Sequence, residues 1–214
     1  MLDANKIAAF CATYGTPLCD LPGALNIVYI EGMNQDGSLN LDLPDRWNDL
    51  RIIVAKGLTG WKIVHNAIAT TEPGAYYTIN PMKPEGCARI AFGYHEPAWA
   101  EGLHKGKQLA LVQRGRVKIH RDLNRNMKRD RSEVAEWTGP EAGINQHSTS
   151  EGFKGKRIGK HSAGCLVGKD YTEHLRFLRI LTNDVRYGEI KSISGVFLRD
   201  TWVLPGDKFH AFKL

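Results

Sequence analysis

A histidine and a cysteine that lie 18 residues apart could together form a nucleophile and its base. They fall in the stretch from 144 to 167, INQHSTSEGFKGKRIGKHSAGCLV, as His147 and Cys165. A thiol becomes a strong nucleophile when a base removes its proton or a positive neighbour lowers its pKa. The base must lie within hydrogen-bond reach in space, not in sequence. We therefore expect two strands, one on each side of a loop, to bring the two side chains together.

The residues around the cysteine add a possible oxyanion site. Gly164 has no side chain, which permits a sharp turn and lets a substrate carbonyl approach the N–H groups of Gly164 and Cys165. Ser148 and Ser162 would orient the imidazole or the substrate. The alternative is that Cys165 is a small buried hydrophobic residue and His147 a satisfied core or surface residue. The Gly-, Lys- and Ser-rich segment between the two strands predicts an exposed, mobile loop.

The same stretch resembles the active-site motif of L,D-transpeptidases, which have the YkuD-like fold. In that family a histidine precedes a [Ser/Thr]-His-Gly-Cys sequence by a similar interval. The matching positions here are His147, Ser148, Ser162, Gly164 and Cys165. The resemblance implies that Cys165 is the nucleophile and His147 its base.

Two positions depart from the family pattern. Ala163 stands where the family has a second histidine, and Val167 where it has Asn or Arg. These positions shape the substrate site, so the departures bear on the substrate or the reaction direction more than on the nucleophile. More of the chain looks like phage and bacterial proteins that carry a SAGC version of the motif, over residues 71–74, 76–77, 102–113, 121–122 and 143–165.

The resemblance implies cysteine-dependent acyl transfer or hydrolysis on peptidoglycan stem peptides, with peptidase or endolysin-type use included. The expected partner is a stem peptide, the expected state is a monomer, and no metal or organic cofactor is needed. The alternative is a non-catalytic virion or cell-wall-binding protein that retains the fold. Aromatic and histidine side chains in segments interpreted as loops are candidate substrate-binding residues: Tyr76, Tyr94 and His104.

Composition indicates one globular domain over residues 1–214. Apolar residues make up 42% and charged residues 24%, and the 22 glycines and nine prolines predict many turns. We expect a mainly β fold with a few helices (α+β), which the resemblance specifies as a YkuD-like β-sandwich or open barrel. Asp3 would cap an N-terminal helix over about residues 3–14 that acts as a packing appendage.

Net charge favours a polyanionic partner. The chain carries a net charge of +6, and residues 104–131 hold ten Lys or Arg against two Asp. No aromatic residue lies between Lys105 and Arg131, whereas single-stranded nucleic-acid sites interleave aromatic platforms with basic charge. We therefore expect an anionic cell wall, not a nucleic acid.

Metal-binding patterns are weak. The four cysteines show no CxxC pair. Residues 122–133 follow part of a calcium-loop spacing, but Met127 replaces the turn glycine and basic residues flank it. A turn rich in Asn and Asp is the better interpretation, and calcium binding stays open.

Periodicity predicts the remaining elements. Expected strands cover 26–31, 51–55, 61–71 and 88–92, with a hairpin of 109–113 and 117–120 around Arg114-Gly115. A helix of about 13 residues would begin at Asp170, with His174 on its surface. One or two strands would cover 192–203, and a terminal edge segment 209–214.

No secretory signal or membrane-length apolar stretch is visible, so we expect no membrane span. The protein would be made in the cytoplasm without a signal peptide and would act on the cell wall after phage-type release or injection.

Overall fold

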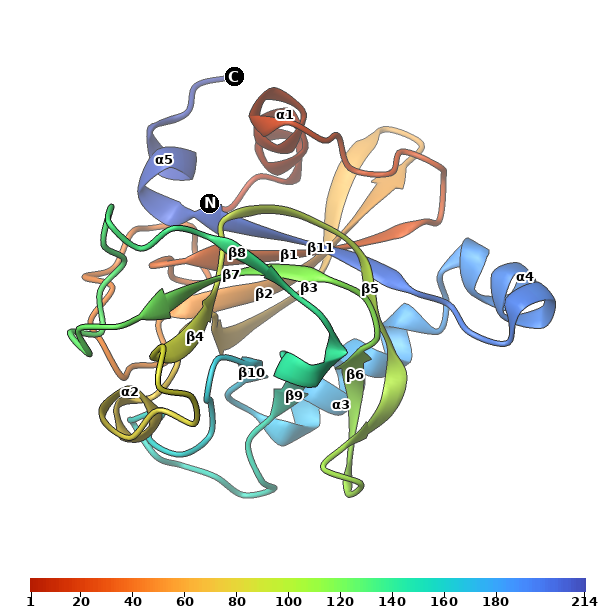
Figure 1. Cartoon of the computed structure of the whole chain (residues 1–214). Coiled ribbons are helices and arrows are strands. Elements are labelled where there is room, and N and C mark those ends of the chain that lie inside the picture. Colours follow the sequence, from red (N-terminus) through yellow and green to blue (C-terminus); the bar gives the residue numbers. More distant parts are fainter.

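Eight strands close into a barrel in the computed structural model, which describes residues 1–214 (Figure 1). The expectation of a mainly β protein with a few helices is confirmed. The sheet closes on itself, whereas a sandwich or an open barrel was expected. The barrel strands are β1 (Leu25–Glu31), β2 (Asp49–Gly57), β3 (Gly60–Thr70), β5 (Gly93–His104), β6 (Gln108–Gln113), β9 (Gln146–Ser148), β10 (Leu166–Gly168) and β11 (Arg199–Pro205).

The order around the barrel is β1-β11-β5-β6-β9-β10-β3-β2. Two neighbouring pairs, β1 with β11 and β9 with β10, are parallel, and the other pairs are antiparallel. Parallel neighbours require a long connection. For β9 and β10 that connection is the Gly- and Lys-rich loop.

A second, three-stranded sheet packs against the barrel core. It is formed by β4 (Cys87–Ile90), β7 (Val117–Asp122) and β8 (Glu136–Thr138), in the order β4-β7-β8. Ile90 and Ile119 of this sheet belong to the same apolar cluster as barrel residues Ile27 and Trp99. The helices are α1 (Ala4–Tyr14), α2 (Ala75–Ile79), α3 (Tyr171–Leu181), α4 (Val185–Ser194) and α5 (Gly206–Ala211), with a short 3₁₀ turn at Pro140–Ala142.

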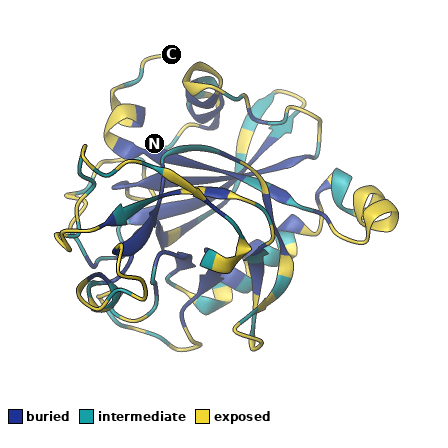
Figure 2. Cartoon of the chain, viewed as in Figure 1, coloured by how far each residue is buried: buried dark blue, intermediate teal, exposed yellow.

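The strands β1 and β2 are buried on both faces, which explains their continuous apolar sequences. Ile27 and Tyr29 pack into the larger core, while Val28 and Ile30 point the other way into a second core. Helices α1 and α5 contribute to that second core and lie on the same side of the barrel in Figure 1. Figure 2 shows the result as dark strands between yellow outer helix faces.

The predicted N-terminal helix is confirmed as α1. Asp3 caps it, because its carboxylate accepts a 2.8 Å hydrogen bond from the Asn5 N–H. Ile7 and Cys11 are fully buried, so this helix is a packing element. The predicted strands in the first 92 residues also form, with boundaries shifted by a few residues.

The expected hairpin around Arg114 and Gly115 is wrong. Its two strands are β6 and β7, which belong to different sheets. The N–H groups of both residues donate to the Ala98 carbonyl, at 2.6 and 3.0 Å, instead of closing a turn. The chain therefore crosses from the barrel to the smaller sheet at this point.

Three other expectations near the middle and end of the chain are also wrong. Residues 93–104 form the long strand β5 instead of a loop, because β11 and β6 pair with its two edges. Residues 192–194 end helix α4, and only the part from Arg199 is a strand. The terminal segment forms α5, whose Phe209 packs edge-on against Phe10 at 5.7 Å.

His174 is buried and not on the surface as expected. It lies on α3, which begins after Asp170 as predicted. One ring nitrogen donates to the Leu109 carbonyl at 2.8 Å, and the other lies 3.0 Å from Nη1 of Arg51. Sequence periodicity places His174 on the solvent face of α3. In the structure this residue contacts Arg51, a buried arginine of the barrel.

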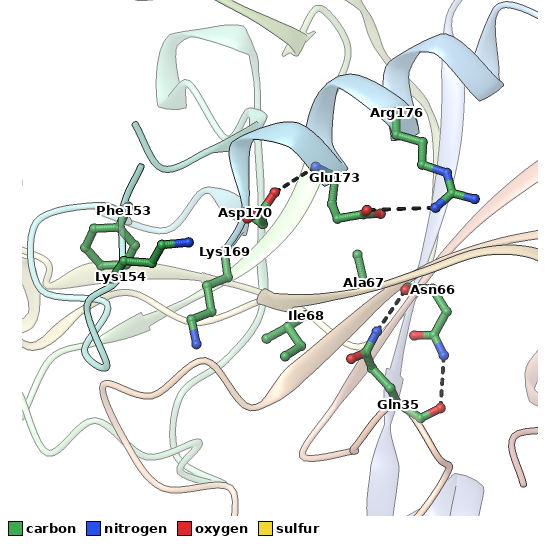
Figure 3. A pocket seen from close by; sticks show the side chains of 10 residues that line it. All are labelled: Gln35, Asn66, Ala67, Ile68, Phe153, Lys154, Lys169, Asp170, Glu173 and Arg176. Atoms are coloured by element: carbon green, nitrogen blue, oxygen red, sulfur yellow. Dashed lines mark hydrogen bonds and ion pairs between the residues drawn. The ribbon is translucent and has the colours of Figure 1, made fainter. Parts of the chain in front are cut away.

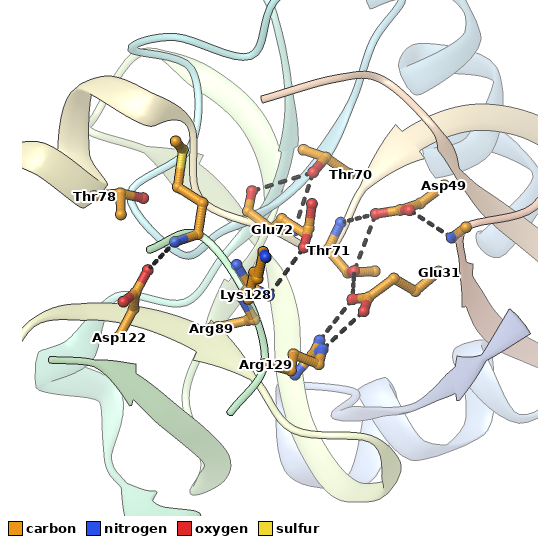
Figure 4. A network of polar contacts seen from close by, with 12 residues as sticks. Glu31, Asp49, Thr70, Thr71, Glu72, Thr78, Arg89, Asp122, Lys128 and Arg129 are labelled. Atoms are coloured by element: carbon orange, nitrogen blue, oxygen red, sulfur yellow. Dashed lines mark hydrogen bonds and ion pairs between the residues drawn. The ribbon is translucent and has the colours of Figure 1, made fainter. Parts of the chain in front are cut away.

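A buried network of charges lies where β1, β2, β3 and β4 meet (Figure 4). Arg129 holds Glu31 through two hydrogen bonds, at 2.8 and 2.7 Å. Arg89 lies 3.0 Å from Glu72. Asp49 has no cationic partner and instead accepts hydrogen bonds from backbone N–H groups.

No helix in this fold is both long and apolar enough to span a lipid bilayer.

Candidate active site

The strands β9 and β10 place the predicted histidine and cysteine beside each other, but no hydrogen bond joins the two side chains. His147 lies on β9 opposite Val167 of β10. Cys165 directly precedes β10, and the next N–H, of Leu166, donates to the Asn145 carbonyl at 3.0 Å. A nitrogen of the His147 ring and the Cys165 sulfur lie within 4.8 Å of each other.

The turn before Cys165 depends on glycine. Gly164 has a φ of +119°, and a Cβ built there would lie 2.7 Å from the Ala88 carbonyl oxygen. The Ser162 hydroxyl closes the turn, because it donates to the Cys165 carbonyl at 2.8 Å and accepts the Gly164 N–H at 3.2 Å. Ser162 therefore shapes the turn and does not contact the imidazole.

The tautomer of His147 is fixed by the backbone. Its Nδ1 lies 2.8 Å from the Ser148 carbonyl oxygen, which can only accept, so Nδ1 carries the proton. In the neutral ring Nε2 is then free to accept a proton. The Ser148 hydroxyl takes no part in this, because it donates to Thr149 and accepts from Gln108.

Both partners rest in their neutral forms. Burial raises the pKa of the Cys165 thiol to about 11, and a hydrogen bond from the Asn145 backbone offsets only part of this rise. Burial, together with the nearby His104, lowers the pKa of His147 to about 3. The thiol donates a weak hydrogen bond to the Gly143 carbonyl at 3.3 Å. The neutral His147 ring can therefore accept a proton at Nε2.

The expected oxyanion hole is only partly available. The Gly164 N–H points to the Ser162 hydroxyl, a consequence of the left-handed backbone at the turn. The Cys165 N–H donates to no acceptor within the protein. One of the two expected backbone donors is therefore free.

His104 is the third side chain of the site. Its ring stacks on that of His147, with centroids 3.9 Å apart and planes 13° apart. A ring nitrogen of His104 also lies within 4.8 Å of the Cys165 sulfur. It stands at the end of β5, and the bond that holds it comes from Asn145, whose Nδ2 lies 2.9 Å from Nδ1 of His104.

Of the other two residues expected to bind substrate, neither is brought into contact with the cysteine. Tyr94 packs against Trp202, with ring centroids 5.6 Å apart, and lines a separate groove with Arg186 and Phe197. Tyr76 lies on α2, and Nζ of Lys160 sits 4.2 Å from its ring centroid. Tyr76 thus contacts the loop between β9 and β10.

That loop covers the cysteine more tightly than its composition suggests. Its lysines are exposed, but Ile158 is fully buried and packs in one cluster with Cys165 and Trp47. The side chain of Asp45 accepts the Gly159 N–H at 2.7 Å and lies 3.5 Å from Arg157. The loop is therefore fastened at one point beside the site.

His161, the histidine nearest to Cys165 in sequence, faces away into this loop. Its ring packs against Phe153, at 4.4 Å between centroids, and near Trp47 at 6.1 Å. His161 is not among the groups whose ligand atoms gather at the cysteine.

Two clusters have a geometry that could hold a metal ion. One is formed by His104, His147 and Cys165, a set that suits zinc. The other is formed by Glu31, Asp42 and Glu72. In the second cluster arginines already contact two of the acidic groups, Glu31 and Glu72.

Hydrogen bonds among its own groups close the candidate calcium loop. Asp122 accepts the N–H groups of Asn126 and Met127, and Asp130 accepts the side-chain amides of Asn124 and Asn126. This is the turn rich in Asn and Asp that the sequence analysis favoured.

A surface groove of about 530 Å³ lies beside the start of α3 (Figure 3). Its polar groups largely bind one another: Gln35 pairs with Asn66, and Glu173 lies 3.8 Å from Arg176. Lys169, which follows β10, lines this groove, and its carbonyl accepts the Thr149 hydroxyl at 2.7 Å.

Sequence reasoning missed Asn145 and Asp45. Asn145 stands two residues before His147 in the stretch already singled out, so its position was a usable signal. Asp45 is about a hundred residues away, and nothing in the sequence around it indicates a role at the site.

Comparison with known protein families, with curated proteins and with solved structures finds no match.

Proposed function

We propose that this protein is a cysteine acyltransferase or peptidase of the L,D-transpeptidase type, with a YkuD-like fold, that acts on peptidoglycan stem peptides. One observation carries the proposal. Nε2 of His147 is left free to accept a proton, and the ring lies within 4.8 Å of the Cys165 sulfur. A merely structural cysteine requires no such neighbour.

The reaction would proceed through a thioester. His147 takes the thiol proton as the Cys165 sulfur attacks a peptide carbonyl, and the oxygen becomes an oxyanion. The protonated imidazole then gives its proton to the departing amine as the C–N bond breaks. An acceptor amine or water, deprotonated by His147, attacks the thioester. The thiol is restored when the new acyl bond forms.

The neutral resting pair has a kinetic consequence. Because the thiolate is scarce at pH 7, proton transfer and attack must be concerted or closely coupled, and an oxyanion donor then contributes strongly. A buried, undissociated thiol also resists oxidation while no substrate is bound.

The choice of peptidoglycan rests on the SAGC motif and on the charge. Four basic side chains border the loop over the site: Lys154, Lys156, Arg157 and Lys160. They would attract the carboxylates of stem peptides and the anionic polymers of a cell wall. On this proposal the protein reaches the wall by phage-type release or injection.

The test is mass spectrometry of muropeptides after incubation with purified protein. We expect new crosslinked or cleaved stem peptides with the wild type and none with Cys165→Ala. The alanine variant should keep the thermal stability of the wild type, because only one sulfur is removed. Products that are undiminished in Cys165→Ala would refute the mechanism.

The competing candidate is a virion or wall-binding protein that keeps the fold without catalysis. The observation in its favour is that Cys165 is only 8% exposed. Retention on purified sacculi by wild type and Cys165→Ala alike, with no change in muropeptides, would support it.

A further inference from the structure

The side chain of Asn145 fixes which nitrogen of His104 carries a proton. Its Oδ1 accepts the backbone N–H of Gln113 at 2.9 Å, and this N–H can only donate. The amide orientation is therefore set, and its Nδ2 must donate toward Nδ1 of His104 at 2.9 Å. An Nδ1 that accepts a hydrogen bond has no proton, so in the neutral ring Nε2 carries it.

We infer that His104 supplies the second oxyanion donor of this site through its Nε2–H. The inference rests on the proposed acyl transfer at Cys165. Nε2 is the one polar atom of the ring without a partner in the protein. A carbonyl carbon bonded to the sulfur would place its oxygen one bond further, within reach of a ring that already lies beside that sulfur.

The backbone alone supplies only one free N–H group for an oxyanion. An oxyanion hole uses two aligned donors, and here the Gly164 N–H is taken by Ser162 while the Cys165 N–H is free. His104 would complete the pair. Burial and the charge of Lys105 lower the pKa of His104, which keeps it a neutral donor at pH 7.

The same proton argues against a metal ion at this site. Ligation through Nε2 would move the ring proton to Nδ1, where it would meet the donating amide of Asn145. The amide cannot flip without placing its NH₂ against the Gln113 N–H. The two histidines therefore divide their roles: His147 accepts a proton, and His104 donates a hydrogen bond.

Stacking on His147 is the other contribution that His104 could make, so the test separates the two. His104→Phe keeps a flat ring against His147 but has no donor. His104→Gln gives up the stacking but retains a side-chain N–H. The probe is p-nitrophenyl acetate, with acylation of Cys165 followed by the release of nitrophenolate and by intact mass. Alkylation by iodoacetamide at pH 9 serves as a reference, because that displacement forms no oxyanion.

We expect His104→Phe to acylate about 10²–10³-fold more slowly than wild type and His104→Gln to lie within about tenfold of it. Alkylation should change by less than about threefold in both variants. Equal acylation by the Phe variant and the wild type would overturn the inference, and so would a Gln variant slower than the Phe variant.

A direct measurement is independent of any rate. Long-range ¹H–¹⁵N correlation of the imidazoles shows which nitrogen bears the proton, and we expect Nε2–H for His104 and Nδ1–H for His147. The opposite tautomer of His104 would overturn the inference. Ester acylation that shows the expected pattern without any muropeptide product would support the donor and refute only the proposed substrate.

Discussion

The molecule has two buried polar regions, and they differ in how their groups are satisfied. Around Glu31, polar groups bind one another directly: Arg129 makes two bonds to Glu31, and Arg89 lies 3.0 Å from Glu72. Around Cys165, the groups are neutral and each keeps one reactive atom free. In the first arrangement most of the groups already bind a partner, whereas the second places a proton acceptor, a hydrogen-bond donor and a thiol beside one another.

The comparison teaches that burial alone does not mark a functional site. Strong pKa shifts occur in both regions: the pKa of Glu72 is raised to about 9 and that of Cys165 to about 11, each mainly by burial. In the first region the shifted groups bind one another. In the second region they lie around the Cys165 sulfur. Atoms without a hydrogen-bond partner therefore distinguish a candidate reactive site from a structural network.

The largest expected effect is on the rate of acylation, at His147. We expect His147→Ala to slow acylation of Cys165 by about 10²–10⁴-fold, because the thiol loses its base. Because His147 is buried and stacked on His104, the variant should also lose some stability, and urea denaturation checks that it remains folded. The measurement is the burst of nitrophenolate from p-nitrophenyl acetate.

The matched control is His161→Ala, which removes a histidine four residues from the cysteine that faces the loop instead. We expect its acylation rate to match the wild type. A slower His161→Ala combined with a normal His147→Ala would reverse the assignment of the base.

The next effect is on stability, in the charge network. Arg129→Met should lower the free energy of unfolding by about 3–5 kcal/mol, because Glu31 is left buried without its counter-ion. Urea denaturation measures it. The control is Arg121→Met, whose partner Glu136 is exposed, and we expect a loss of no more than about 1 kcal/mol there.

Equal losses in the two variants would mean that the network contributes no more than a surface ion pair. The charge network could then no longer be described as a region that stabilises the fold.

A smaller effect concerns the pH dependence of stability. Burial and the charges of Glu31 and Asp42 raise the pKa of Asp49 to about 8. The unfolded chain loses this proton near pH 4. Between these values the folded state holds one more proton, so raising the pH favours unfolding, by up to about 1.4 kcal/mol per pH unit.

Between pH 7 and 8, stability should therefore fall less, or rise more, in Asp49→Asn than in wild type, because the histidines contribute equally to both proteins and cancel in the comparison. The geometry agrees, since the Thr71 hydroxyl lies 2.7 Å from Glu31 and 3.0 Å from Asp49 but has only one proton to give. Urea denaturation at the two pH values measures the slope. Identical slopes in wild type and variant would show that Asp49 is ionised.

The smallest effect tests the loop over the site. Asp45→Ala removes the acceptor of the Gly159 N–H and the partner of Arg157. Opening of the loop should become easier by about 1 kcal/mol, so iodoacetamide at pH 9 should alkylate Cys165 a few-fold faster. Asp36→Ala, in an exposed turn, is the control and should leave the rate unchanged.

Features that depend on local pattern can be predicted from the amino-acid sequence alone. The continuous apolar runs of β1 and β2, the cap at Asp3 and the helix after Asp170 all follow from residue type and spacing. So does the pairing of His147 with Cys165, because a short strand on each side of a loop suffices to bring them together. The sharp turn at Gly164 was also predictable, because glycine readily adopts the positive φ that such a turn uses.

Contacts between residues that are distant in sequence could not be predicted, because they depend on how the strands pair. His104 could be suspected, but its stacking on His147 depends on β5 being a strand, and that strand forms through its pairing with β6 and β11. The failed hairpin has the same origin: Ala98, distant in sequence, captures the backbone of Arg114 and Gly115. The residue pattern within one segment indicates which of its faces is apolar. The hydrogen-bond partners of its polar atoms lie in distant segments, so that pattern does not indicate them.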